Sequence, residues 1–167
     1  MLSPFKISTL AKDGGHSDFL KTKNELSGSP TKVIDRQETA KYHSIVVIED
    51  GIERIRYIPH AKKHEAPIVL IHGMWHGAWC WKYWQEKLAE KGWESVSISL
   101  PGHGQSPEQR PIAECTLGYY LYFLKEEIAR HKVQPIVFGH SMGGALLQWY
   151  LKHVGDVKAA VFVASWT

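Results

Sequence analysis

The chain has 167 residues, of which 44% are hydrophobic, and its formal net charge at pH 7 is +3. This length and apolar content suit one domain with its own core. The charge is mild and no stripe of lysine and arginine stands out, so we expect no nucleic acid partner. No apolar run has membrane-spanning length and the N-terminus lacks a signal-peptide core, so we expect a cytoplasmic protein without a membrane partner.

The first forty residues differ from the rest of the chain. Residues 1–40 are polar and show no sustained hydrophobic period, and Ser27-Gly28-Ser29-Pro30 is typical of a loop. Their acidic residues argue against a targeting peptide. We therefore predict a loosely ordered arm over residues 1–40 and a core domain over residues 41–167.

Strand patterns begin after this arm. Two β-rich runs, 44–48 and 52–58, flank Asp50-Gly51, a dipeptide that favours a hairpin turn. Further strand patterns follow along the chain: the apolar runs 68–71 and 135–138, and the segments 96–100 and 158–164. The run 68–71 is continuously apolar, as expected for a parallel strand that is buried on both faces.

Helix patterns lie between these runs. The first carries three apolar residues on one face, namely Trp81, Trp84 and Leu88. Gly92 can end that helix, and Thr116 can begin the next as its N-cap. The second helix has apolar residues at helical spacing, at Leu117, Tyr120, Leu121, Leu124 and Ile128. A third pattern covers 145–153. Strands that alternate with helices predict an α/β fold with a mostly parallel, doubly wound sheet.

The stretch Gly139-His140-Ser141-Met142-Gly143-Gly144 lies between the run 135–138 and the helix pattern 145–153. A strand, a Gly-x-Ser-x-Gly turn and a helix in this order are the pattern of a nucleophile elbow. The serine of such a tight turn has a strained backbone, so Gly139 and Gly143 must lack side chains. Its hydroxyl is exposed at a helix N-terminus, which favours negative charge. A glycine-rich turn with an ordinary surface serine is the alternative interpretation.

Three motifs together resemble the α/β-hydrolase superfamily: His72-Gly73, Pro101-Gly102-His103-Gly104-Gln105-Ser106, and Gly139 to Gly144. The segment from His72 to Trp81 is similar to the branch that contains esterases and hydroxynitrile lyases. The resemblance covers residues 45–167. It departs from the family at Ser99, where the superfamily usually has an aspartate with a mainly structural role.

The resemblance implies that Ser141 is the nucleophile of an esterase-like hydrolase that works through an acyl-enzyme. It implies an oxyanion hole made by the backbone N–H groups of Met142 and Met74. One such donor contributes on the order of 3 kcal/mol to transition-state stabilisation. The substrate site is expected to comprise His72, Gly73, Trp75, His76, His103 and His140. No cofactor is implied, and the expected partner is a small-molecule ester or an apolar ligand.

Several aromatic residues and histidines have alternative roles. A packed cluster that holds the first helix on the sheet is the alternative for Trp75, and the favoured role of Trp79, Trp81 and Trp84. The pair His72 and His76 could indicate a metal site, but the glycines beside them indicate a loop, where this spacing does not bring two ligands together. We expect no metal, and interpret His72 as packing the loop and His140 as a filler of the elbow.

Residues 142–167 contain a single histidine, His153, and a single aspartate, Asp156. In this fold the acid and the histidine follow the serine along the chain. At about 1.5 Å per residue, the elbow helix places His153 well over 10 Å from Ser141, so neither residue can serve. A base from His72, His76 or His103 is disfavoured, because the base approaches from the side opposite the oxyanion donors.

We therefore predict an α/β-hydrolase core without the C-terminal strands and the cap, inactive or nearly so by itself. A truncated gene product, an incomplete reading frame and half of a split enzyme remain open. The strand 158–164 would then be an uncovered apolar edge, suited to self-association or to pairing with the missing C-terminal part. A non-catalytic protein that binds small molecules is the second hypothesis, and a cyanohydrin lyase is a weaker one.

Overall fold

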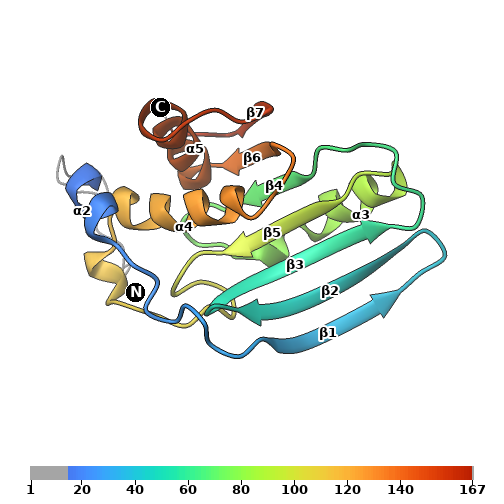
Figure 1. Ribbon diagram of the computed structural model, residues 1–167, viewed down its shortest axis with the longest axis horizontal. Coiled ribbons are helices and arrows are strands. Elements are labelled where there is room, and N and C mark those ends of the chain that lie inside the picture. The colour runs from blue at the N-terminus through green and yellow to red at the C-terminus, as the bar shows by residue number, and fades with distance from the viewer. Residues whose placement is uncertain (1–14, 167) are drawn as a thin grey trace.

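A single seven-stranded sheet forms the centre of the computed structural model, which describes residues 15–166 (Figure 1). The strand order across the sheet is β1-β2-β3-β5-β4-β6-β7. Three neighbouring antiparallel strands form one side: β1 (Lys32–Glu38), β2 (Tyr42–Glu49) and β3 (Ile52–Pro59). β3 also pairs antiparallel with the first of four mutually parallel strands: β5 (Ser95–Ser99), β4 (Ile68–Ile71), β6 (Ile136–His140) and β7 (Ala159–Val163).

Helices cover both faces of the parallel part. A 3-10 turn (Ala78–Trp81) and α3 (Lys82–Glu90) lie on one face, where Trp81 and Leu88 pack with Leu70. The opposite face packs against α4 (Leu117–Ala129) and α5 (Met142–His153). α2 (Gly15–Lys21) packs on α4, and a second 3-10 turn covers Ile112–Glu114. These layers are those of a doubly wound α/β fold, as predicted.

β4 shows why a continuous apolar run belongs at the centre of this sheet. Ile68 and Leu70 belong to the core under α3, whereas Val69 and Ile71 belong to the core under α4 and α5. All four side chains are at most 2% exposed. Because both faces of a parallel strand are covered by helices, alternation with polar residues is not needed.

The predicted helix boundaries have the expected local chemistry. The Thr116 side chain accepts a hydrogen bond from the Tyr119 N–H, at 3.0 Å, and so caps α4. Gly92 follows α3 with φ of +89°, a conformation that glycine adopts without strain. Its N–H donates to the carbonyl of Ala89 at 2.9 Å. The hairpin at Asp50-Gly51 is also confirmed, since it joins β2 to β3.

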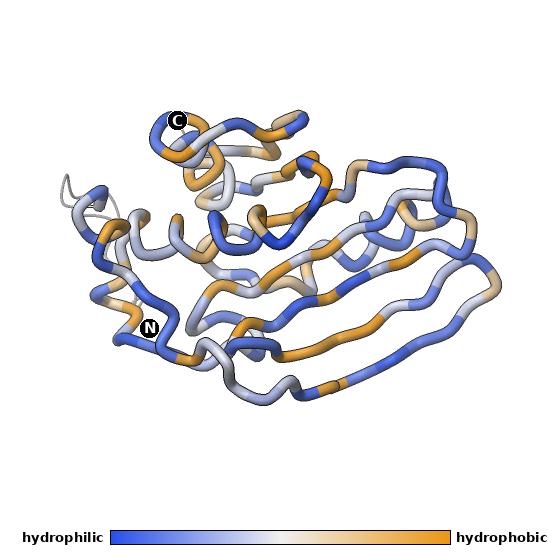
Figure 2. Tube along the Cα trace, viewed as in Figure 1, coloured by the Kyte–Doolittle hydropathy of each residue, from blue (hydrophilic) through white to orange (hydrophobic). Residues whose placement is uncertain are grey.

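The predicted arm needs a correction. Within residues 15–40 the structure has two regular elements, α2 and β1, that the polar composition did not indicate. β1 pairs with β2 through backbone hydrogen bonds, and its register shifts at a bulge between Val33 and Asp35. Figure 2 shows that β1 is mostly hydrophilic, so backbone pairing rather than side-chain burial makes it a strand. Residues 1–14 lie outside the described part of the chain, and the domain boundary itself stays a prediction.

β7 lies at the other edge of the sheet, next to β6. Its side chains are exposed or half-buried, and Phe162 is 45% exposed. The expected edge position of this strand is thus confirmed, whereas self-association stays a prediction. Neither cysteine, Cys80 or Cys115, forms a disulfide. No helix between residues 15 and 166 combines the length and the apolar character that a membrane span requires.

Candidate active site

Ser141 lies at the junction of β6 and α5 with φ of +51° and ψ of −114°. A non-glycine residue with positive φ is strained, and such strain gathers at functional sites. The neighbouring glycines leave no room for side chains. A Cβ on Gly139 would lie 2.5 Å from the Gly143 carbonyl oxygen, and one on Gly143 would lie 2.6 Å from that of Ile71. The backbone therefore has the geometry of a nucleophile elbow.

The loop after β4 lies directly against this turn. A Cβ on Gly73 would come within 3.1 Å of the Ser141 Cβ and 2.9 Å of His140 Nδ1. Met74 and Met142, whose backbone N–H groups are the expected oxyanion donors, are 2% and 0% exposed. The two backbone segments expected to form an oxyanion hole are thus brought together.

The end of β7 supports the turn from its other side. The Ser141 N–H donates to the Val163 carbonyl at 3.0 Å, and the Trp166 N–H donates to the Ser141 carbonyl at 3.3 Å. A Cβ on Gly144 would lie 2.2 Å from Ser165 Oγ, so the segment after β7 packs closely on α5. The strained backbone of Ser141 is held by hydrogen bonds on both of its peptide groups.

Two of the expected substrate-site histidines are buried in the loops beside the elbow. His72 has no exposed surface, and its Nε2 accepts a hydrogen bond from the Leu100 N–H at 3.0 Å. The proton is therefore on Nδ1, which donates to the Gly73 carbonyl at 2.7 Å. Burial, and then the neighbouring His103, lower the pKa of His72 to about 3. This neutral ring fixes the loop, as interpreted from the sequence, and offers no ring nitrogen to a substrate.

His103 joins the loops that follow β4 and β5. Its Nε2 lies 2.9 Å from the Met74 carbonyl oxygen and its Nδ1 lies 3.1 Å from that of Pro101. The ring is 6% exposed, and burial lowers its pKa. The neutral ring has one N–H, so it bridges the two loops in the tautomer that carries the proton on Nε2, which then donates to the Met74 carbonyl.

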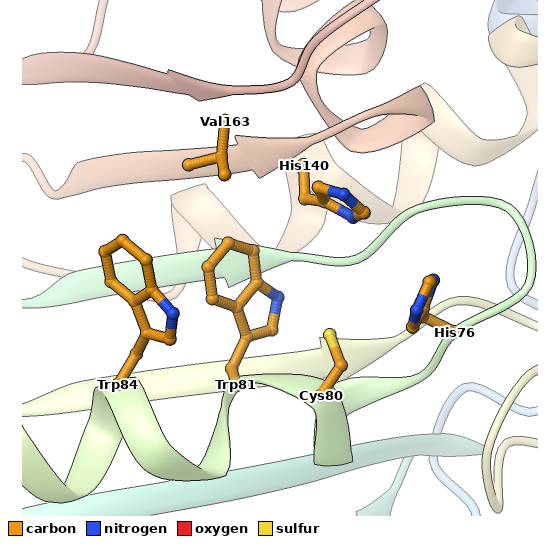
Figure 3. A pocket seen from close by; sticks show the side chains of 6 residues that line it. All are labelled: His76, Cys80, Trp81, Trp84, His140 and Val163. Carbon is orange, nitrogen blue, oxygen red and sulfur yellow. The ribbon is translucent and has the colours of Figure 1, made fainter.

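A pocket of about 190 Å³ opens beside the elbow on the α3 side of the sheet (Figure 3). It is lined by His76, Cys80, Trp81, Trp84, His140 and Val163. The rings of His76 and His140 meet edge to face with centroids 5.4 Å apart. Burial, followed by the charge of His76, lowers the pKa of His140, so this ring is neutral at pH 7. The pocket thus offers aromatic surfaces and the neutral imidazole of His140.

Trp81 adds a polar group to this pocket. Its side chain is 3% exposed, yet its indole Nε1 has no hydrogen-bond partner among the described residues. Two other tryptophans of this region correct the expected packed cluster, since Trp75 is 67% and Trp79 is 57% exposed. Trp81 packs in the core with Ile68 and Leu70 beneath α3. Trp84 is 45% exposed but meets the rings of Trp81 and Phe138 edge to face, so these two tryptophans pack as expected. Trp75 does not line the pocket that holds His76 and His140.

His153 and Asp156 lie where the sequence predicted. His153 is exposed at the end of the twelve-residue helix α5, where its ring meets those of His16 and Trp149 at 5.1 and 5.5 Å. Asp156 is exposed beyond the same helix end. Neither of these ring contacts involves Ser141. Among residues 15–166, no three histidine, cysteine, aspartate or glutamate side chains are arranged to hold a metal ion.

One polar cluster in this region, around Glu53, has no signal in the sequence. Glu53 is 3% exposed and bonds to Ser99 and Gln105. In the sequence Ile52-Glu53-Arg54-Ile55, this glutamate resembles a solvent-facing residue of an alternating strand. Its bonding partners are 46 and 52 residues further along the chain, so no local pattern could reveal them.

Comparison of the sequence with models of protein families shows the family of this chain. The model of the alpha/beta hydrolase family matches residues 68–167. The chain belongs to the alpha/beta hydrolase family. Within that family it is 30% identical over 105 residues to norfluorocurarine synthase 1 of Strychnos nux-vomica, covering 62% of this chain and 40% of that protein. It is 33% identical over 100 residues to pFDCC methylesterase MES16 of Arabidopsis thaliana, covering 58% of this chain and 38% of that protein.

Solved structures agree on the fold. The chain aligns with the thioesterase domain from the curacin biosynthetic pathway at a TM-score of 0.58 and 21% identity, covering 82% of this chain and 47% of that one. The monoacylglycerol lipase of Paleococcus ferrophilus aligns at a TM-score of 0.59 and 21% identity, covering 68% of this chain and 43% of that one. The chain spans about 40% of the length of the first two relatives named above. The resemblance to alpha/beta hydrolases with esterase relatives is thus confirmed.

Proposed function

We propose that Ser141 is the nucleophile of an acyl-ester hydrolase and that the backbone N–H groups of Met74 and Met142 form its oxyanion hole. The observation that carries this proposal is the strained Ser141 backbone, with φ of +51°, at the N-terminus of α5. A turn that lifts a hydroxyl above the helix N-terminus favours the negative charge of a tetrahedral intermediate. The methylesterase relative supports a small ester as the substrate class.

The histidine and the acid of the mechanism come, in this proposal, from outside the 167 residues. His72 and His103 use ring nitrogens on backbone carbonyls and N–H groups, and His153 lies at the far end of α5. Removing the base of a serine hydrolase lowers turnover roughly 10⁶-fold. We therefore expect the 167-residue chain to be inactive or nearly so by itself.

The test is mass spectrometry of the chain after treatment with a fluorophosphonate, with and without added imidazole. Imidazole in solution can replace a missing histidine, so it should accelerate labelling at Ser141 and leave Ser141→Ala unlabelled. Rapid labelling without imidazole would contradict the external base. No labelling of the folded chain, even with imidazole, would contradict the nucleophile.

A second candidate function is the binding of a small apolar ligand without turnover. The aromatic pocket beside His140, with the unpartnered N–H of Trp81, supports this candidate. A ligand that binds the wild-type chain and Ser141→Ala equally, and is recovered unchanged, would favour it. Ligand binding that depends on Trp81 but not on Ser141 is the expected signature.

A further inference from the structure

Glu53 is a buried carboxylate in the middle of the sheet, on β3. Burying an ionised carboxylate is unfavourable unless hydrogen bonds replace its water. Glu53 Oε2 accepts hydrogen bonds from Ser99 Oγ at 2.5 Å and from the Gln105 N–H at 3.1 Å. Glu53 Oε1 accepts from Gln105 Nε2 at 3.1 Å. All of these donors belong to β5 or to the loop after it.

Ser99 carries this contact onward to the loop that follows β4. Its Oγ accepts a hydrogen bond from the Ala78 N–H at 2.8 Å while it donates to Glu53. Ala78 begins the 3-10 turn that ends the loop from His72 to Gly77. A Cβ on Gly77 would lie 3.0 Å from Ser99 Oγ, so this loop lies close against the hydroxyl. One carboxylate thus anchors both strand-end loops.

The loop after β5 is folded tightly onto the same carboxylate. Gly104 has φ of +53°, and a Cβ there would come within 2.3 Å of both Glu53 Oε2 and Ser99 Oγ. The Glu53 N–H donates to Ser106 Oγ at 2.8 Å. This fold of the loop places His103 Nε2 2.9 Å from the Met74 carbonyl oxygen.

We infer that Glu53 is a positioning residue for the oxyanion hole. It holds one end of the β4 loop through Ser99 and Ala78, and it holds the Met74 peptide through the β5 loop and His103. An oxyanion donor contributes only while its N–H points at the developing charge, so the direction of the Met74 N–H is the quantity that Glu53 controls. The catalytic meaning of this role rests on the proposed function, whereas the positioning itself does not.

The chain offers a direct way to observe the two expected oxyanion donors. It has three methionines, and apart from the terminal Met1 they are Met74 and Met142. Labelling with ¹⁵N-methionine therefore gives backbone amide signals from Met74 and Met142 alone. Glu53→Gln keeps the shape of the side chain but replaces one carboxylate oxygen with an amide NH₂ group. This NH₂ group then faces hydrogen-bond donors of Ser99 or Gln105 and cannot accept from them. We expect this variant to shift or broaden the Met74 signal and to leave the Met142 signal in place.

A second variant restores the charge from the neighbouring strand. Since Ser99 Oγ accepts from the Ala78 N–H and lies 2.5 Å from Glu53 Oε2, an aspartate at position 99 places a carboxylate beside the Ala78 N–H and close to the position of the Glu53 carboxylate. The double variant Glu53→Gln with Ser99→Asp should return the Met74 signal toward its wild-type position. Glu38→Gln is the matched control on β1, where the glutamate side chain is 71% exposed, and it should move neither signal.

Three results would overturn the inference. They are an unmoved Met74 signal in Glu53→Gln, an equal displacement of both methionine signals, and a double variant that restores nothing. If Glu53→Gln does not fold, Gln105→Ala is the second variant: it removes the side-chain hydrogen bond from Gln105 Nε2 to Glu53 Oε1 and keeps both the carboxylate and the bond from the backbone N–H. It should shift the Met74 signal alone, and an unmoved signal there overturns the inference too. Because no labelling of Ser141 enters this test, failure of the proposed nucleophile is seen separately.

Discussion

Gly118 on α4 lies directly against Gly15 on α2, so closely that a Cβ at position 118 would come within 1.5 Å of the Gly15 carbonyl oxygen. Next to this contact, Asp18 accepts two hydrogen bonds from Arg110 Nη1, at 2.9 and 3.0 Å. The guanidinium of Arg110 lies 4.0 Å from the centroid of the Tyr119 ring. α2 is therefore attached to α4 by close backbone packing, and to the segment before α4 by one charge pair.

Gly118→Ala should displace α2 and lower the free energy of unfolding by about 1–3 kcal/mol, the usual cost of overpacking. Urea unfolding measures the loss, and limited proteolysis after Lys21 measures the detachment of α2. Gly155→Ala is the control, because nothing lies within 4 Å of a Cβ there. Equal protease resistance of Gly118→Ala and the wild type would contradict the tight contact.

The strained elbow predicts an unusual ranking of two small substitutions at Ser141. Glycine relieves the strain of a positive φ, whereas alanine keeps it, so Ser141→Gly should be more stable than Ser141→Ala by about 1 kcal/mol. At Ser17, an exposed position in α2, alanine should instead be the more stable of the two. Chemical denaturation of the four variants measures which of the glycine and alanine variants is the more stable at each position. The same ranking at both positions would mean that Ser141 is not strained.

Glu127 on α4 makes stability depend on pH through its buried ion pair with Arg54, whose Nε lies 2.7 Å from Glu127 Oε2. Burial alone would raise the pKa of Glu127, but the nearby His131, whose Nε2 lies 3.5 Å from Glu127 Oε1, and the charge of Arg54 outweigh it and hold the pKa at about 2. Because the pKa of Glu127 is lower in the folded protein than the ordinary value of 4.5, the ionised carboxylate stabilises the fold at pH values above 4.5. This contribution, on the order of 3 kcal/mol, is lost as the pH falls toward 2.

Glu127→Gln should therefore be less stable than the wild type at pH 7, and the difference should shrink between pH 4.5 and 2. Urea unfolding of both proteins across this range is the measurement. Other carboxyl groups titrate in the same window, but they cancel in the difference between the two proteins. A difference that stays constant with pH would contradict the assignment to Glu127.

The edge strand β7 predicts self-association of the chain at high concentration. Unpaired backbone groups and the 45% exposed Phe162 offer a pairing surface. Phe162→Lys should reduce the association measured by sedimentation velocity. Val133→Lys, at a site that is 42% exposed and lies in the loop before β6, should have no effect. Association that is unchanged by Phe162→Lys would place the contact elsewhere.

Sequence patterns predicted most of the central sheet because its strands are apolar and its turns carry glycine. They did not predict β1, because the segment Lys32–Glu38 forms a strand through backbone pairing and buries little apolar surface. They failed for α2 because its attachment depends on the absence of side chains at Gly15 and Gly118, which has no periodic signature. At the site, the elbow is a local motif and was predictable, whereas Glu53 gains its role from partners far along the chain.

The position of β4 in the sheet has a consequence for the order of folding. The strands β1 to β3 pair with their neighbours in the chain, so this meander can form as soon as Pro59 has left the ribosome. β4 instead pairs with β5 and β6, and its second partner ends at His140. Contacts between distant segments form slowly, because a long loop must close first. During synthesis, the apolar β4 therefore lacks its second partner until β6 and the serine turn have been made. A chaperone that shields β4 in this interval should raise the yield of folded protein.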